Sequence, residues 1–171
     1  MEVQDVINNK NDKEYILSAV KEKGKFLEYA SEELKDDKEI VQVALEQDAE
    51  ALEFASKRLK DDKEILSIGV KGAPWTICYA SEKLRADREL ILNSCKSYGQ
   101  ALYFASKKLR DDKEVVKAAV ENKGIIIKYA SKRLQNDKEL AKIAVKQNKD
   151  AYHFISLELK QDEEIRSLLS L

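Results

Sequence analysis

Apolar residues recur along this chain in a pattern that returns every 25 residues. Counting from an aspartate as position 1, apolar or small residues fill positions 4, 5, 8 and 9, as in Ile40, Val41, Ala44 and Leu45. This spacing places side chains on one side of an α-helix. A second stripe at positions 15, 16, 19 and 23 predicts a second helix. Glycine or proline at position 13 separates the two in four of the six repeats.

The aspartate at position 1 marks six full repeats, which start at residues 12, 37, 62, 87, 112 and 137. Residues 1–11 are a lead-in, residues 12–161 hold the repeats, and residues 162–171 form a partial repeat that we expect to cap the core. So short a unit cannot enclose its own apolar surface, so neighbours must stack. We therefore predict an all-α protein, an α-solenoid (superhelix) of six helix-turn-helix repeats, as a single domain over residues 1–171. A coiled coil is excluded because 25 is not a multiple of seven.

Position 8 is always small, which indicates that another backbone passes close to the first helix of each repeat. The residues at this position are Ala19, Ala44, Gly69, Ser94, Ala119 and Ala144.

The fifth repeat, DKEVVKAAVENKGIIIKYASKRLQND at Asp112 to Asp137, resembles a bacterial helical-repeat family catalogued as domain of unknown function 4116. The resemblance covers Asp12 to Gln161 and departs at Pro74 and Trp75, and in the sixth repeat. It implies a repeat fold and no known activity. The short period is also similar to that of a leucine-repeat variant associated with iron–sulfur proteins, in which one helix is tight. That likeness implies that the second helix is partly a 3-10 helix.

Acidic clusters such as KDDKE at residues 35–39 recur at each junction between repeats. If position 25 is the N-cap, the Glu of position 3 completes a capping box. The predicted pairs are Asn11/Glu14, Asp36/Glu39, Asp61/Glu64, Asp111/Glu114 and Asn136/Glu139, with Asp87 as the cap where Ala86 cannot serve. A ladder of cation sites is the alternative. It is disfavoured because carboxylates on successive repeats would lie ~10 Å apart. We therefore expect no metal site.

Composition indicates a soluble protein without membrane spans. The formal charge is −1, and 37% of the 171 residues are charged. The first residues lack the features of a secretory signal. Two cysteines, Cys78 and Cys95, are too few for a disulfide framework and fit a reducing cytoplasm, which is the expected location.

Candidate catalytic residues are sparse, so we expect no enzyme and no cofactor. Position 20 is serine in all six repeats, but a nucleophile needs a base within reach and the chain has one histidine, His153. We expect these serines to allow close packing, with the hydroxyl bonded to a carbonyl one turn back. We expect His153 to be exposed, Cys95 to be buried, and Cys78 to lie on the outer face.

Positions 14, 17 and 21 should form the outer face of the second helix. This face is charged in the first two repeats and becomes apolar and aromatic in repeats three to five. The predicted partner-binding strip consists of Trp75, Cys78, Tyr98, Tyr103 and Ile125. Exposed aromatic clusters of this kind mark protein or peptide interaction sites. The alternative is that Trp75 packs locally over Pro74.

Charge is uneven along the chain, which raises a second possible function. Repeats one and two sum to −5, whereas repeats three to six sum to +7. Nucleic-acid binding through the basic repeats is therefore the runner-up. Its candidate residues are Lys107, Lys108, Arg110, Lys128, Lys132 and Arg133. A third possibility is a monomer that associates weakly into a homodimer through a terminal face, if Leu157 and Leu171 are exposed.

Overall fold

The computed structural model describes residues 1–169, and its contacts group the chain into two compact units. Unit 1 is Met1–Leu84 and unit 2 is Arg85–Leu171. Both are built from helices and turns, and residues 1–169 contain no strand. The chain is an all-α repeat protein of the solenoid class, as predicted.

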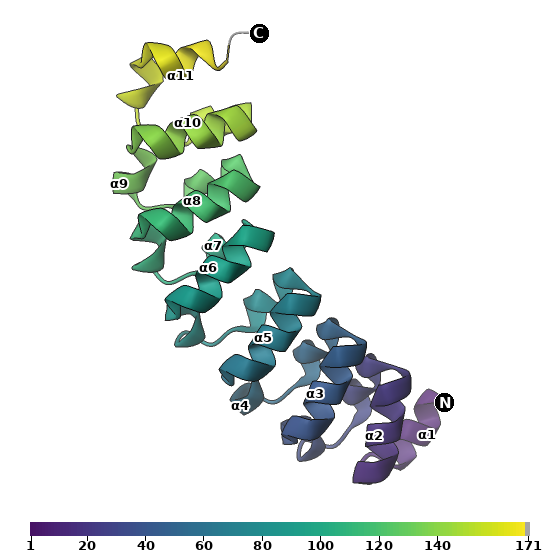
Figure 1. The fold of residues 1–171 in the computed structure, drawn as a ribbon. Helices are drawn as coiled ribbons and strands as arrows, with labels where there is room; N and C mark the ends of the chain where they lie inside the picture. The colour runs from purple at the N-terminus through teal and green to yellow at the C-terminus, as the bar shows by residue number, and fades with distance from the viewer. Residues whose placement is uncertain (170–171) are drawn as a thin grey trace. The chain divides into compact units, whose positions relative to one another are not determined.

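Each repeat opens with an α-helix of ten residues that carries the first apolar stripe. Within each unit these helices pack side by side (Figure 1). They are α2 (Lys13–Glu22), α3 (Lys38–Gln47) and α5 (Lys63–Gly72) in unit 1, and α6 (Arg88–Ser97), α8 (Lys113–Asn122) and α10 (Lys138–Gln147) in unit 2. Two shorter helices, α1 (Val3–Asn8) and α11 (Glu163–Ser167), precede and follow the repeats.

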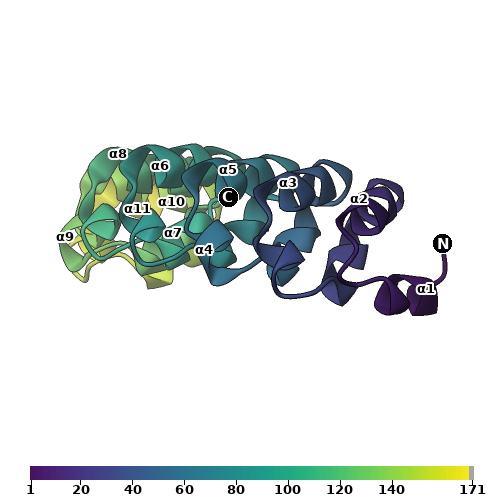
Figure 2. The ribbon, with the colours of Figure 1, turned by 90° about the horizontal axis from the view of Figure 1, so that it is seen from below.

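The second segment of most repeats is a 3-10 helix, which confirms the tight second helix that the sequence implied. In each unit these segments form a second layer beside the α-helices (Figure 2). They are η1 (Gly24–Tyr29), η3 (Ala49–Phe54), η4 (Pro74–Tyr79), η7 (Gly124–Tyr129) and η8 (Lys149–His153). The fourth repeat has instead the short helix α7 (Ala101–Phe104).

A third short segment follows, so the predicted two-helix repeat needs correction. At position 19 the backbone is extended, as at Ala30, where φ is −66° and ψ is 157°. The chain then makes one more turn over positions near 23 to 25. These turns are η2 (Leu34–Asp36), α4 (Lys57–Lys60), η5 (Leu84–Ala86), η6 (Leu109–Asp111), α9 (Lys132–Gln135) and η9 (Leu159–Gln161). Position 21 therefore belongs to a different segment from positions 14 and 17.

The core of each unit is continuous from one repeat to the next, and it uses the predicted apolar stripes. Position 16 is fully buried in repeats one to five, as Leu52 and Leu102 show, and half-buried in the sixth, at Tyr152. Leucine at position 23 is also buried in every repeat. Burial of a leucine side chain stabilises the fold by about 1.5 to 3 kcal/mol. Stacking thus supplies the apolar contacts that a single repeat lacks.

The small residue at position 8 allows the close approach that the sequence predicts. A Cβ atom built on Gly99 would lie 2.6 Å from the carbonyl oxygen of Ala119, and one on Gly124 would be closer still to the carbonyl oxygen of Ala144. Neither glycine has a positive φ. Gly99 and Gly124 are therefore needed for space rather than for an unusual backbone conformation.

The helix N-caps are the aspartates at position 1, one residue later than predicted. Asp37 has extended backbone, and its side chain accepts hydrogen bonds from the N–H groups of Glu39 and Ile40. Asp36, the predicted cap, lies instead inside η2. The prediction was therefore wrong at Asn11, Asp36, Asp61, Asp111 and Asn136, and right at Asp87.

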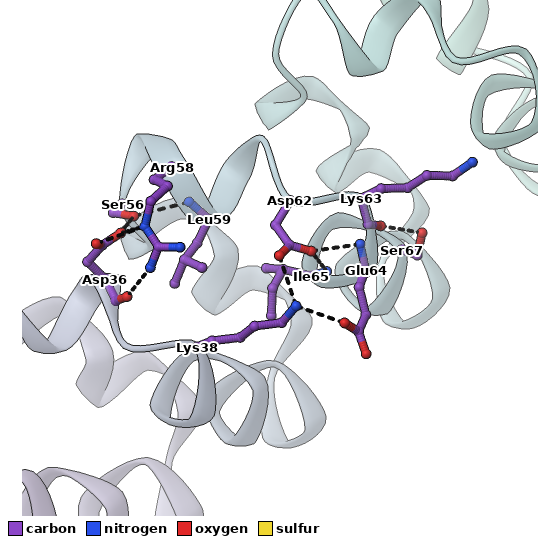
Figure 3. A network of polar contacts seen from close by, with 10 residues as sticks. All are labelled: Asp36, Lys38, Ser56, Arg58, Leu59, Asp62, Lys63, Glu64, Ile65 and Ser67. Carbon is purple, nitrogen blue, oxygen red and sulfur yellow. Dashed lines mark hydrogen bonds and ion pairs between the residues drawn. The ribbon is translucent and has the colours of Figure 1, made fainter.

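The same aspartates bind the preceding repeat through a ladder of ion pairs. Lys38 contacts Asp62 and Glu64, its neighbours one repeat further along (Figure 3). Five such rungs, with N–O distances of 2.5 to 2.9 Å, join Lys13 to Asp37 and Glu39, Lys38 to Asp62 and Glu64, Arg88 to Asp112 and Glu114, Lys113 to Asp137 and Glu139, and Lys138 to Asp162 and Glu164. The lysine or arginine at position 2 occupies the place that a cation would need.

The serine at position 20 forms a second junction between repeats. The hydroxyl of Ser56 donates to the carboxylate of Asp36 and accepts from the N–H of Leu59 at 3.1 Å (Figure 3). The Ser56 N–H donates to the carbonyl oxygen of Lys35 at 3.0 Å. Ser81 with Asp61, Ser131 with Asp111 and Ser156 with Asn136 repeat the hydroxyl contact. The expected bond to a carbonyl one turn back is therefore wrong.

Arginine strengthens this junction in one repeat of each unit. Arg58 donates from Nε to the Asp36 carboxylate at 2.9 Å, and Arg133 contacts Asp111 at 3.0 Å. Hydrogen bonds from Ser56 and then from Arg58 hold the pKa of Asp36 below its usual value. Both carboxylates thus serve as structural acceptors.

Candidate functional site

An aromatic groove of about 280 Å³ opens on unit 2, where α6, α7 and η7 meet. Three of the five residues chosen from the sequence line it together. The lining residues are Tyr98, Gln100, Tyr103, Phe104, Lys123, Ile125, Ile126, Lys128 and Tyr129.

The tight backbone of the second segment explains why these side chains converge. A 3-10 helix has three residues per turn, so positions 14 and 17 lie above one another on one face. In η7 these positions are Ile125 and Lys128, and Tyr103 holds position 17 of the preceding repeat. Tyr98 caps the C-terminus of α6, just before the turn into α7. Adjacent repeats therefore supply opposite walls of the aromatic groove.

Tyr103 is the most exposed aromatic residue of the groove, with 56% of its surface accessible. Its ring centroid lies 5.0 Å from those of Phe104 and Tyr129, in edge-to-face geometry with both. Aromatic rings prefer this arrangement, which fixes their orientation. The groove therefore presents a preorganised apolar edge to solvent.

A second groove, of about 530 Å³, continues from the first and shares Lys128 with it. We call it the lysine groove. It is lined by Lys128, Lys132, Gln135, Asn136, His153, Phe154, Ile155, Ser156, Leu157 and Lys160. Two apolar side chains here are exposed, Phe154 to 37% and Leu157 to 80%.

Lysine supplies the charge of both grooves. The Nζ atom of Lys128 lies 4.9 Å from the Tyr129 ring centroid and 5.8 Å from that of Phe154. Lys160 donates to the carbonyl oxygen of His153 at 2.9 Å. Among residues 1–169, no aspartate or glutamate lines either groove. Unit 2 has 18 basic and 13 acidic residues, a formal charge of +5, which adds to this local field.

Trp75 and Cys78, the other two residues of the predicted strip, belong to unit 1. Trp75 has 36% of its surface accessible, and its ring centroid lies 6.3 Å from that of Tyr79. Cys78 is half-buried on the same 3-10 helix, η4. Trp75 thus has both a local packing partner and an exposed edge.

Sequence reasoning missed three important residues of the aromatic groove, Phe104, Tyr129 and Lys123, and it named Lys128 only as a nucleic-acid candidate. Phe104 and Tyr129 occupy position 18, which is aromatic in every repeat and was assigned to the fold. Lys123 precedes η7, and Lys128 lies within it. The sequence offered one signal for Phe104 and Tyr129: position 18 directly follows position 17, which was predicted to be exposed.

The corresponding face of repeats one and two, in unit 1, has a different chemistry. Lys25 and Glu50, both at position 14, form an ion pair at 2.5 Å, and Lys25 also lies 3.8 Å from Asp48. Glu28 and Glu53, at position 17, are exposed. This face is polar and largely neutralised by its own contacts.

The residues considered for catalysis occupy the places expected for structural roles. His153 is exposed and Cys95 is buried, as predicted. Burial raises the pKa of the Cys95 thiol to about 12, so this thiol stays protonated. Within residues 1–169, no group of three or more His, Cys, Asp or Glu side chains is placed to hold a metal ion. None of the helices in that range has the length and apolar character needed to cross a membrane.

The two layers of helical segments, the constant period and the junction contacts that recur from repeat to repeat define this chain as a helical-repeat protein. The chain belongs to the family described as Domain of unknown function (DUF4116), whose model matches residues 12–60, 44–85, 62–110, 87–135 and 112–160. Four of these matches start at the aspartate that begins a repeat and end within a repeat junction, at residues 12–60, 62–110, 87–135 and 112–160. No curated protein and no solved structure matches the chain.

Proposed function

We propose that this protein is a non-enzymatic scaffold that binds a protein or peptide through the aromatic groove of unit 2. The observation that carries the proposal is the convergence of Tyr98, Tyr103 and Ile125 on one groove. Exposed aromatic anchors beside apolar walls are typical of protein interaction hot spots. A location in the cytoplasm, which the low cysteine content favours, is part of the same proposal.

The absence of catalytic activity is also proposed, and two contacts support it. The hydroxyl groups of Ser56 and Ser131 donate to carboxylates, which leaves them as structural donors. The single histidine, His153, lies in the lysine groove and serves as an acceptor for Lys160 through its backbone. A serine nucleophile needs a base that can take its proton, and the hydrogen bonds that lower the pKa values of Asp36 and Asp111 make both carboxylates weaker bases.

Photo-crosslinking in the cells that naturally produce the protein tests the proposed site. A benzophenone side chain replaces Tyr103 in one variant and Glu28 in a matched control, because both residues are exposed at position 17. We expect a protein adduct with the Tyr103 variant alone. Equal labelling at both positions, or labelling at neither, would refute the aromatic groove as the binding site.

Nucleic-acid binding is the alternative function, and a separate experiment tests it. Of its six candidate residues, Lys128 and Lys132 line the grooves, Lys107 and Lys108 are exposed, and Arg133 contacts Asp111. A gel shift with single-stranded and double-stranded oligonucleotides at low salt would detect this activity. Retardation that is lost on replacing Lys107 and Lys108 with alanine would favour nucleic acid over protein.

Self-association into a homodimer is the third possible function of the exposed surface. Leu157 is 80% exposed, as the homodimer hypothesis requires, whereas Leu171 lies outside the described residues. Sedimentation of the wild-type protein and of a Leu157→Lys variant would reveal a dimer that depends on this side chain.

A further inference from the structure

We infer that the ligand of unit 2 is an acidic, extended peptide segment with two apolar side chains about three residues apart. This inference rests on the proposed function and specifies its partner. One apolar side chain would enter the aromatic groove and the other the lysine groove.

The two grooves are separate places for apolar side chains on consecutive repeats. Ile125, Ile126 and the Tyr103 ring wall the first, and Ile155 and Leu157 belong to the second. Because both grooves include Lys128, a ligand that fills one is in reach of the other. An elongated ligand therefore suits this surface better than a compact one.

The distance between repeats sets the spacing of the two anchors. Stacked helical segments lie ~8 to 10 Å apart. A polyproline II segment turns its side chains to the same side every third residue and advances about 9 Å in doing so. Grooves with aromatic walls are also the usual receptors of this conformation. Anchors at the first and fourth positions of such a segment match two adjacent repeats.

The positive charge of the grooves indicates that the ligand residues around the two apolar side chains are acidic. On the α-helical layer of unit 2, Lys113, Lys117, Lys138 and Lys142 are paired with carboxylates, for example Lys117 with Glu139 and Lys142 with Glu164. None of the ion pairs among residues 1–169 involves the four groove lysines, which are Lys123, Lys128, Lys132 and Lys160. Carboxylates of a ligand would complete the pairs that this face lacks.

The ring contacts favour a peptide over a nucleic acid. Base stacking needs an accessible ring face. The ammonium group of Lys128 lies over the rings of both Tyr129 and Phe154, and Tyr103 meets its neighbours edge to face. These rings are better placed to contact aliphatic or aromatic side chains from the edge.

Panning of a phage-displayed library of short random peptides on the full-length protein tests the inference. We expect the enriched peptides to share acidic residues and two apolar residues at the first and fourth positions of a motif. The recovered peptides are then synthesised, labelled and titrated by fluorescence anisotropy against the wild type and its variants.

Three variants assign the affinity to the grooves. We expect Tyr103→Ala to weaken binding by about thirtyfold and Lys128→Glu by about tenfold. Lys96→Glu makes the same charge change at an exposed site on α6, outside both grooves, and should change affinity by less than about twofold. Circular dichroism of each variant checks that the fold is retained. A further variant, Lys128→Gln, removes the charge without reversing it, so its affinity shows how much of the Lys128→Glu effect comes from loss of the positive charge.

The possible results separate this inference from the proposed function. If no peptide is enriched on the wild type relative to Tyr103→Ala, both are refuted. If the enriched peptides are basic or neutral, or if their apolar residues follow a helical spacing, the inference alone is wrong. Retardation of a short oligothymidylate by the wild type but not by Lys128→Glu would also overturn it in favour of single-stranded nucleic acid.

Discussion

Repeats one and two, in unit 1, and repeats four and five, in unit 2, carry different chemistry at the same exposed positions. At positions 14 and 17, repeats one and two have Lys25 paired with Glu50 and an exposed Glu28, and the third repeat of unit 1 has Trp75 and Cys78 there. Unit 2 has Tyr103, Ile125 and Lys128 there, which line the two grooves. The buried positions agree between the units. The comparison teaches that the fold depends on the buried and junction positions, whereas the exposed face of the second segment can change freely.

Replacement of the buried leucine at position 16 should have the largest effect and should be alike in the two units. Leu52→Ala in unit 1 and Leu102→Ala in unit 2 each leave a cavity in a core that is fully buried. We expect each to lower the free energy of unfolding by about 2 to 5 kcal/mol. Urea denaturation followed by circular dichroism measures this. A negligible cost in one unit would show that the two cores are not equivalent.

Loss of the N-cap should rank second, again in both units. Asp37→Ala and Asp112→Ala each remove two hydrogen bonds to helix N–H groups, and we expect a loss of about 1 kcal/mol. Asp112→Asn retains an acceptor and should cost less. If Asp36→Ala reduces the helix content of α3 more than Asp37→Ala does, the assignment of the cap to position 1 is wrong.

Acid should weaken the ion-pair ladder in both units. Hydrogen bonds from Lys113 and then from Lys117 lower the pKa of Glu139 to about 2, and the contact with Lys38 lowers that of Asp62. A carboxylate with a lowered pKa in the folded state stabilises the fold above its unfolded pKa, near 4. That contribution is lost as pH falls toward 2. The melting temperature at a series of pH values, in low and high salt, measures the loss, and Glu139→Gln should reduce the slope. A melting temperature that stays constant from pH 5 to pH 2 would contradict this account.

Exchange of the exposed residues at position 17 should have the smallest effect on stability. Tyr103→Glu and Glu28→Tyr each give one unit the residue type of the other, and we expect changes below about 0.5 kcal/mol. Binding of a selected peptide should be lost in Tyr103→Glu and unchanged in Glu28→Tyr. A large drop in melting temperature for Tyr103→Glu would mean that this ring supports the fold.

The sequence predicted what depends on a single repeat and missed what depends on two. The period, the buried stripes and the small residue at position 8 follow from spacing alone. The partner of Ser56 does not, because Asp36 lies 20 residues earlier, in another repeat. The N-cap was misplaced by one residue for the same reason, since the carboxylate at position 25 is held by the following repeat.

The sequence predicted only part of the candidate site, again because the rest depends on contacts between two repeats. Tyr98, Tyr103 and Ile125 could be chosen because they depart from a charged pattern at exposed positions. Tyr129 could not, because an aromatic residue at position 18 looks ordinary within one repeat, and Lys128 was chosen only as a nucleic-acid candidate. Their role emerges only when the ring of Tyr103 is placed 5.0 Å from that of Tyr129.

The double use of the aspartate at position 1 makes the repeats interchangeable modules. Each block of 25 residues brings both halves of each joint: the cation at position 2 pairs with positions 1 and 3 of the following repeat, and the hydroxyl at position 20 pairs with position 25 of the preceding one. If residues 112–136 were deleted, Arg88 would meet Asp137 and Glu139 in place of Asp112 and Glu114, and Ser156 would meet Asp111. Gene duplication or deletion in whole repeats can therefore lengthen or shorten this chain without a redesigned interface. Cooperative unfolding of the shortened chain would show that the contacts between repeats had formed again.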